Sequence, residues 1–329
     1  GRIRRTCRTA HQQPVKVRVD RQFEAGQQIQ REGGRAIPPR LQEGLQVPVI
    51  VGILRDGGVG GVKIAFEECE TGYNADRAMA CYDRFKARAP LVINPYITDA
   101  AYRLLPLGPV DKIPVHTMGY GVSVAADGSR FPWMFNFPAT YWSQAAAFVQ
   151  FVAASIGGTE KLKGKKIVHL HVATDYGREA NAILNVLAKK YRFRLSLLEV
   201  APPGVDQEAV WNKIAQIEPD WILLSSFGVM TSTAIKSAAA AKFPMERLIG
   251  NAWSGSEADV RPAGDLAKGY TAISFHAAGA GFPLFAGLKR LLYDKGLGTG
   301  SRVWVGEMLY NRGLLNAVYL VEVIRKAQS

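Results

Sequence analysis

Residues 165–224 read KKIVHLHVATDYGREANAILNVLAKKYRFRLSLLEVAPPGVDQEAVWNKIAQIEPDWILL, and strand-like segments alternate with helical ones throughout this stretch. The strand-like segments are the apolar runs at 165–172, 194–200 and 220–224. Between them, residues 176–190 and 206–217 repeat apolar positions at the spacing of an α-helix. Strands separated by helices of this length pair in parallel, because the chain must cross over between neighbouring strands. The stretch therefore predicts an α/β unit with a parallel sheet.

The same alternation extends in both directions. Upstream, the patterns predict strands at 63–67, 91–93 and 113–116, a helix at 76–87, and a short helix that begins at Thr98, a residue suited to an N-cap. Downstream, they predict strands at 247–250 and 270–275 and helices at 232–241, 284–294 and 309–327. A proline- and aromatic-rich join at 131–141 precedes a helix at 142–155 and separates the two series. This organisation favours a two-lobed α/β protein, with a cleft that collects strand ends from both lobes.

Composition narrows the class of protein. The 329 residues are 48% hydrophobic and 21% charged, which is ordinary for a soluble globular chain, and the apolar stretches are shorter than the ~18 residues that span lipid. The net charge of +13 is uneven: residues 1–57 hold 11 basic and 5 acidic side chains, and the remainder holds 30 and 23. Because neither aromatic interleaving nor a helix-turn-helix pattern accompanies the basic residues, we expect no nucleic-acid partner.

The N-terminal segment differs from the rest. Residues 1–46 are rich in Arg and Gln and have no sustained period, so that 1–55 is expected to be an atypical basic segment that is poorly ordered. Only Val15, Val17 and Val19 alternate as in a short strand. The first residue is Gly and no signal peptide is visible, which predicts a processed chain or a fragment.

Motifs for catalysis and metal binding are weak. The sequence contains no GxSxG, HExxH or P-loop motif, and the glycines at 57–61 precede a strand instead of linking a strand to a helix. His169, His171 and His276 could be gathered around a metal, but half-buried strand histidines are the favoured interpretation. Cys69 and Cys81 are twelve residues apart, and a disulfide and two buried thiols both remain open. We expect no enzyme, cofactor or metal site.

Features of a recognition site are stronger. Several predicted strands are followed by small, hydroxyl or aromatic residues that could bind a carboxylate with backbone N–H groups and hydroxyls. These stretches lie at residues 96–98, 117–120, 225–228 and 251–254.

Three phrases carry a family resemblance: GGVGGVKIAFEECETGYNADRAMACYDRF at 57–85, LKGKKIVHLHVATDYGREA at 162–180 and DWILLSSFGVMTSTAIKSA at 220–238. In order and spacing they resemble the periplasmic substrate-binding proteins of branched-chain amino-acid-type ABC transporters, the leucine/isoleucine/valine-binding kind. The resemblance runs from about Arg55 to Ala327. It implies the type I periplasmic-binding fold, a two-lobed Venus flytrap of parallel sheets flanked by helices, here with an atypical N-terminus and a truncated C-terminus. The lobes would comprise 56–138 plus 276–329, and 139–275.

The resemblance also implies the ligand-binding residues. Thr98, Gly119 and Tyr120 match the first-lobe hydroxyl and backbone positions that bind a ligand carboxylate. In the second lobe, Tyr176 matches the family's aromatic position and Phe227 the position after the next strand. Trp253, in the stretch after the strand that ends at Gly250, is the sixth candidate ligand-binding residue.

Two departures from the family concern the ligand. Amino-acid binders place an acid, which takes the ligand ammonium, after the strand that ends at Gly250, whereas this chain has no acid until Glu257. Because an unpaired buried ammonium is costly, an aromatic carboxylate fits better than an α-amino acid. The stretch WSGSEADV is also similar to that of aromatic-acid binders in the family. Asp99, beside Thr98, would repel a carboxylate unless its side chain points away.

The resulting function is a solute-binding component of an ABC uptake transporter. It would bind a branched-chain amino acid-like or aromatic carboxylate in the cleft and deliver it to a membrane permease. A monomer is expected, located in the periplasm or, in a Gram-positive host, outside the cytoplasm and membrane-associated. The alternative is a ligand-sensing domain of a receptor or transcription regulator with the same fold.

Overall fold

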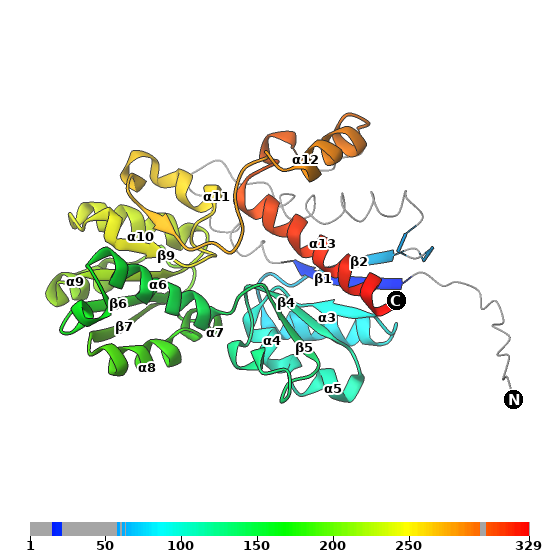
Figure 1. Cartoon of the computed structure of the whole chain (residues 1–329), viewed down its shortest axis with the longest axis horizontal. Coiled ribbons are helices and arrows are strands. Elements are labelled where there is room, and N and C mark those ends of the chain that lie inside the picture. Colours follow the sequence, from blue (N-terminus) through cyan, green and yellow to red (C-terminus); the bar gives the residue numbers. More distant parts are fainter. Residues whose placement is uncertain (1–14, 22–57, 60, 63, 297–300, 329) are drawn as a thin grey trace, which may run out of the picture.

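Two parallel sheets with helices on both faces make up the computed structural model, which describes residues 15–21, 58–59, 61–62, 64–296 and 301–328 (Figure 1). The first sheet has the strand order β2-β1-β3-β4-β5 and the second has β10-β9-β8-β6-β7. Every pairing between these strands is parallel, as the alternation of strands and helices predicts. The elements that pack on each sheet are called the first lobe and the second lobe below.

The first lobe is built from segments at both ends of the described chain. Its strands are β1 (Val15–Arg21), β2 (Ile64–Glu70), β3 (Val92–Asn94), β4 (Val115–Met118) and β5 (Met134–Phe137). Helices α3 (Ala75–Lys86), α4 (Thr98–Leu104) and α5 (Leu107–Asp111) follow strands of this sheet. One apolar cluster joins α3 and α4 to β3, β4 and β5, and another packs the C-terminal half of α13 (Met308–Gln328) against β2 and β3. A disulfide between Cys69 and Cys81, with Cα atoms 6.0 Å apart, ties β2 to α3.

The second lobe is built around residues 165–224, which contain three of its strands. Its strands are β6 (Lys166–Val172), β7 (Arg194–Val200), β8 (Trp221–Ser225), β9 (Leu248–Gly250) and β10 (Thr271–Ala272). Helices α6 (Tyr141–Ser155) and α8 (Asn181–Tyr191) share one apolar cluster with the sheet, and α9 (Glu208–Ile217) and α10 (Val229–Ala240) share another. Strand β8 is buried along its whole length, since it is covered on both faces.

Shorter helices connect these layers. They are α7 (Asp175–Arg178) after β6, α11 (Glu257–Val260) after β9 and α12 (Pro283–Leu288) before α13. The chain passes from β5 to α6 and returns from β10 to α12 and α13, and Figure 1 shows α13 running from the side of the second lobe across the first sheet. The expected lobe limits, 56–138 plus 276–329 and 139–275, stay a prediction.

Some sequence predictions are confirmed and others are wrong. Val15, Val17 and Val19 do lie in a strand, β1, between β2 and β3. The remainder of the atypical segment at 1–55 lies outside the described residues. Thr98 does begin α4, but Ile97 is the N-cap, and the hydroxyl of Thr98 accepts a hydrogen bond from the N–H of Gly121 instead (3.4 Å).

Two further sequence predictions are wrong. The join expected at 131–141 contains β5, a strand that two flanking prolines, Pro132 and Pro138, conceal in the sequence. The helix expected at 176–190 is broken into α7 and α8 around Glu179. There the indole N–H of Trp142 donates to the carbonyl of Glu179 (3.1 Å), which takes this oxygen away from the helical pattern.

Candidate ligand-binding site

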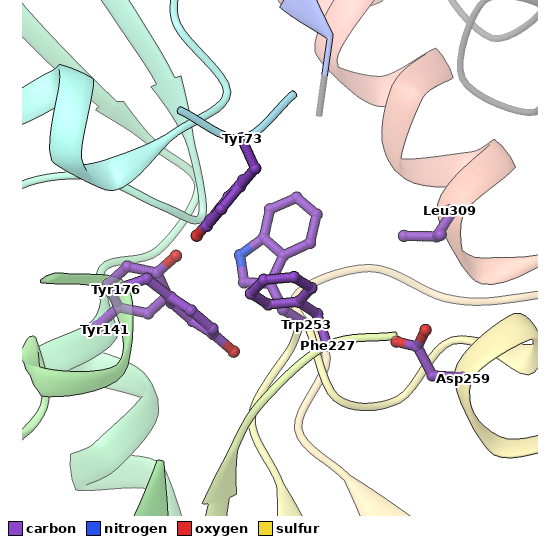
Figure 2. Close-up of a pocket in the computed structure, with 7 residues that line it drawn as sticks. All are labelled: Tyr73, Tyr141, Tyr176, Phe227, Trp253, Asp259 and Leu309. Carbon is purple, nitrogen blue, oxygen red and sulfur yellow. The ribbon is translucent and has the colours of Figure 1, made fainter. Parts of the chain in front are cut away.

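A pocket lies where the carboxyl ends of strands from both sheets meet. Five aromatic side chains contribute to its wall, and each follows a strand of one sheet or the other. The lining residues are Tyr73, Tyr141, Tyr176, Phe227, Trp253, Asp259 and Leu309. Figure 2 shows the aromatic rings pointing towards one another, with Asp259 and Leu309 on one side of the Phe227 and Trp253 rings and the tyrosines on the other. The cavity is ≈ 20 Å³, so these side chains nearly fill it.

Tyr176, Phe227 and Trp253, all predicted from the sequence, line the pocket from the second lobe. The Tyr176 hydroxyl, in α7 after β6, lies 3.0 Å from Ser226 O and 2.9 Å from Asn251 Oδ1, and its single proton can be donated to either oxygen. The Phe227 ring lies 5.9 Å from that of Tyr176 and 4.9 Å from that of Tyr73, measured between centroids. Because Tyr73 follows β2 of the first sheet, Phe227 packs across the two lobes.

The other three predicted residues are not among those that line the pocket. Thr98 is buried beside Tyr141, with which it shares a hydrogen bond. The Tyr120 ring stacks on Tyr96 at 5.4 Å, and its hydroxyl accepts the N–H of Tyr96 (3.1 Å). These side chains lie behind the pocket wall, where they support Tyr141 and Trp253.

Gly119 connects the two lobes through its backbone. Its N–H donates to Phe137 O (2.7 Å), and its carbonyl accepts the indole N–H of Trp253 (3.0 Å). Its φ is 64°, and a Cβ on this residue would lie 2.3 Å from the ring of Phe275. Any side chain would therefore separate surfaces that meet here, which explains a glycine at this position.

Asp259 supplies an acid that the sequence analysis missed. It lies in the short helix α11, its carboxylate accepts the N–H of Gly228 (2.9 Å), and it is 5% exposed. Burial raises the pKa of Asp259 to about 7, although hydrogen bonds from Ser256 and Gly228 oppose the rise. The preference for an aromatic carboxylate over an α-amino acid was based on the absence of an acid before Glu257, and Asp259 now supplies an acid at the pocket.

Arg312 of α13 was also missed. It is 2% exposed, and its guanidinium carbon lies 4.4 Å from the centroid of the pocket-lining Trp253 ring. The available signal was Arg312 directly before the largely apolar stretch GLLNAVYLV at 313–321. Sequence patterns did not indicate that this face of the helix would meet the second lobe.

Asp99 does not line the pocket. Burial and the neighbouring carboxylate of Asp175 raise the pKa of Asp99. Its Oδ2 atom is buried and has no hydrogen-bond partner among the residues that the structure describes. Asp99 thus faces the start of α7 across the lobes, and its expected repulsion of a ligand in the pocket is not supported.

The strand histidines are engaged in hydrogen bonds. His169 contacts Asn181 Oδ1 through Nδ1 (2.7 Å) and Ser225 Oγ through Nε2 (2.8 Å), and burial lowers its pKa to about 3. The His171 ring lies 4.8 Å from that of His169, whereas His276 contacts Arg312. Within the described ranges, no three His, Cys, Asp or Glu side chains are grouped so as to bind a metal ion.

A comparison of the sequence with known protein families agrees with a ligand-binding pocket at this place. Residues 51–284 match the periplasmic binding protein family. The chain belongs to that family. No curated protein matches it at the level of sequence. In the described part of this binding protein, no helix is both long and apolar enough to cross a bilayer.

Solved structures of ABC-transporter proteins have the same type I fold. A structure described as an ABC transporter permease from the Pseudomonas fluorescens group is 37% identical, with a TM-score of 0.82, and the match covers 96% of this chain and 75% of that one. A branched-chain amino acid ABC transporter protein from Thermus thermophilus with bound valine is 19% identical (TM-score 0.79; 96% and 79% covered). A solute-binding protein from Rhodopseudomonas palustris BisB5, in complex with 3,4-dihydroxybenzoic acid, is 16% identical (TM-score 0.70; 95% and 81% covered).

Proposed function

We propose that this protein is the extracytoplasmic solute-binding component of an ABC uptake transporter, and that it delivers a small carboxylate to a membrane permease. The observation that carries the proposal is the aromatic pocket between the strand ends of both sheets, in a chain of the periplasmic binding protein family. Clefts at such strand ends are the usual ligand sites of open α/β sheets. Tyr176, Phe227 and Trp253 offer flat apolar faces, which suit a branched or aromatic hydrocarbon group.

Binding would proceed by hinge motion between the lobes. A cavity of ≈ 20 Å³ accommodates little more than a water molecule, whereas ligand pockets usually measure several hundred Å³. The described conformation is therefore a closed one, and a ligand enters when the lobes separate. Closure then buries the ligand between Tyr73 of the first lobe and the second-lobe residues Tyr141, Phe227 and Trp253.

Two classes of carboxylate fit this pocket. A plain aromatic acid would stack among the rings, with Asp259 protonated. A branched-chain amino acid would place its ammonium near an ionised Asp259. Members of both classes are bound in similar folds, valine in the Thermus thermophilus protein and 3,4-dihydroxybenzoic acid in the Rhodopseudomonas palustris protein.

The disulfide between Cys69 and Cys81 supports a location outside the cytoplasm, because such bonds persist in oxidising compartments. We place the protein in the periplasm, or at the outer face of the membrane in a Gram-positive host, and we expect it to act as a monomer.

A thermal-shift screen tests the proposal. Purified protein is melted with branched-chain amino acids, with benzoate-like acids and with phenylpropenoate-like acids. A ligand that binds only the folded state stabilises it and so raises the melting temperature. At a free ligand concentration of 100 times the dissociation constant, the stabilisation is about 2.7 kcal/mol. A saturable shift with one class supports a solute-binding role and selects that class, whereas a cooperative melt that no carboxylate shifts contradicts it.

A further inference from the structure

Arg312 is a buried cation whose hydrogen bonds are incomplete. Its Nη2 donates to the carbonyl of Ala252 (2.8 Å), and its Nε donates to Nε2 of His276 (3.2 Å). The third nitrogen, Nη1, is buried and has no hydrogen-bond partner within the described ranges. Burial lowers the pKa of Arg312 to about 10, so the guanidinium remains charged at neutral pH.

Among the residues that the structure describes, no carboxylate pairs directly with this charge. None of the ion pairs between described residues includes Arg312. Asp259 interacts with it electrostatically over a longer distance, without a hydrogen bond between them in the same part of the chain. A buried arginine with neither a counter-ion nor a full set of acceptors costs several kcal/mol. An anion bound at Nη1 would supply both the missing counter-ion and the missing acceptor.

The position of Arg312 connects this charge to the pocket. Its guanidinium stacks on Trp253 and on Phe275, with its central carbon 4.4 and 4.8 Å from the two ring centroids. Trp253 lines the pocket, as does Leu309, which precedes Arg312 by one turn of α13 (Figure 2). The guanidinium therefore lies next to the pocket, in contact with one of its lining rings.

His276 orients the guanidinium without competing for an anion. Burial and the charge of Arg312 lower the pKa of His276 to about 4, so the imidazole is neutral at physiological pH. Its Nδ1 lies 3.2 Å from Ala277 O, which assigns the proton to Nδ1 and leaves Nε2 to accept from Arg312. The bond to Ala252 O, in the loop after β9, connects the same side chain to the second lobe.

From these contacts we propose that Arg312 binds the carboxylate of the ligand through Nη1 and so selects anionic solutes. The inference rests on the proposed function and specifies its chemistry: the ligand is a carboxylate because a buried, oriented guanidinium is available to pair with one. Since Arg312 belongs to α13 and also contacts the loop of the second lobe, the bound anion stabilises the closed arrangement of the lobes.

The test compares acids with amides of the same shape. Isothermal titration calorimetry with the full chain measures dissociation constants for benzoate, 3,4-dihydroxybenzoate and valine, and for benzamide and 3,4-dihydroxybenzamide. We expect the wild type to bind at least one acid and to discriminate against its amide. Arg312→Met should weaken binding of the acid by roughly 30- to 1,000-fold, as when one partner of a buried charge pair is removed, and should abolish the preference for acid over amide. Arg312→Lys keeps the charge without the planar fork and should bind with intermediate affinity.

The control is Arg325→Met, which removes an arginine from the same helix where its side chain is 58% exposed and paired with Glu322. It should bind like the wild type. A folded Arg312→Met variant that keeps the acid preference makes Arg312 structural and overturns the inference, although the proposed function stands. Equal binding of acids and amides by the wild type overturns it as well, and this result remains decisive if the Met variant does not fold. A wild type that binds no probe overturns both proposals.

Discussion

At the scale of single residues, Asp259 makes the charge of the pocket depend on pH. Burial raises its pKa to about 7, so the carboxyl is neutral below this pH and negative above it. The polar and ionisable groups that act on it, or that it acts on, are Ser256, Gly228, Arg312, Glu257, Tyr176 and Tyr270. Burial raises the pKa of both tyrosines, and burial lowers the pKa of His276 to about 4, so these groups keep one protonation state near neutrality.

This pH dependence distinguishes the two ligand classes. The affinity for benzoate should fall by roughly 10-fold as pH rises through about 7, because the ionised Asp259 repels a second carboxylate. The affinity for valine should rise over the same interval, because its ammonium gains a partner. Titration calorimetry between about pH 5.5 and pH 8.5 measures both, and Asp259→Asn should flatten either profile. A wild-type profile that is already flat would show that the ligand does not approach Asp259.

Some site residues could be predicted from the sequence and others could not, because different parts of the fold position them. Tyr176, Phe227 and Trp253 each follow an apolar strand, and the carboxyl ends of parallel strands mark the ligand edge of a sheet. Asp259 lines the pocket from α11 and Arg312 packs on Trp253 from α13, and the placement of both helices depends on packing between the lobes. A local sequence pattern carries no information about such packing.

At the scale of elements, Glu179 connects the lobes at the break between α7 and α8. Its carboxylate accepts the hydroxyl of Tyr102 in α4 (2.9 Å) and the N–H of Ser123 (2.7 Å), both in the first lobe. Its carbonyl accepts the indole N–H of Trp142. Burial raises the pKa of Glu179, and the bonds from Ser123 and Tyr102 oppose the rise.

Glu179→Gln tests this connection. The amide has one acceptor oxygen instead of two, so that while this oxygen keeps the N–H of buried Ser123, the Tyr102 O–H loses its acceptor and its oxygen must accept from the amide instead. We expect the free energy of unfolding to fall by about 1–3 kcal/mol, measured by urea denaturation. The control Glu199→Gln alters a glutamate of the same lobe that is 51% exposed and paired with Arg178, and it should change stability by less than about 0.5 kcal/mol. Equal effects of the two substitutions would contradict a specific role for Glu179.

The break at Glu179 illustrates which parts of the fold could be predicted from the sequence and which could not. Strands β6, β7 and β8 and helix α9 were predictable because their apolar patterns are long and agree with their surroundings in the fold. The break at Glu179 depends on Trp142, 37 residues away, and therefore leaves no local signal. Strand β5 was missed because four residues between prolines are too few to display a period.

At the scale of the whole molecule, the two lobes meet through contacts that must break when a ligand enters. Trp253 donates to Gly119 O, Glu179 accepts from Ser123, and Phe227 packs on Tyr73. Small-angle X-ray scattering should therefore show a smaller radius of gyration with a saturating carboxylate than without it, because a carboxylate bound to Arg312, which belongs to α13 and contacts the second lobe, favours closure. Glu179→Gln weakens the closed form, so without ligand it should scatter as a more open molecule than the wild type, and the ligand should produce a larger change.

The control variant Glu199→Gln should match the wild type in both states. Identical scattering with and without a ligand that demonstrably binds would mean that entry requires only local movement of the Phe227 and Trp253 rings, and that the lobes do not rotate.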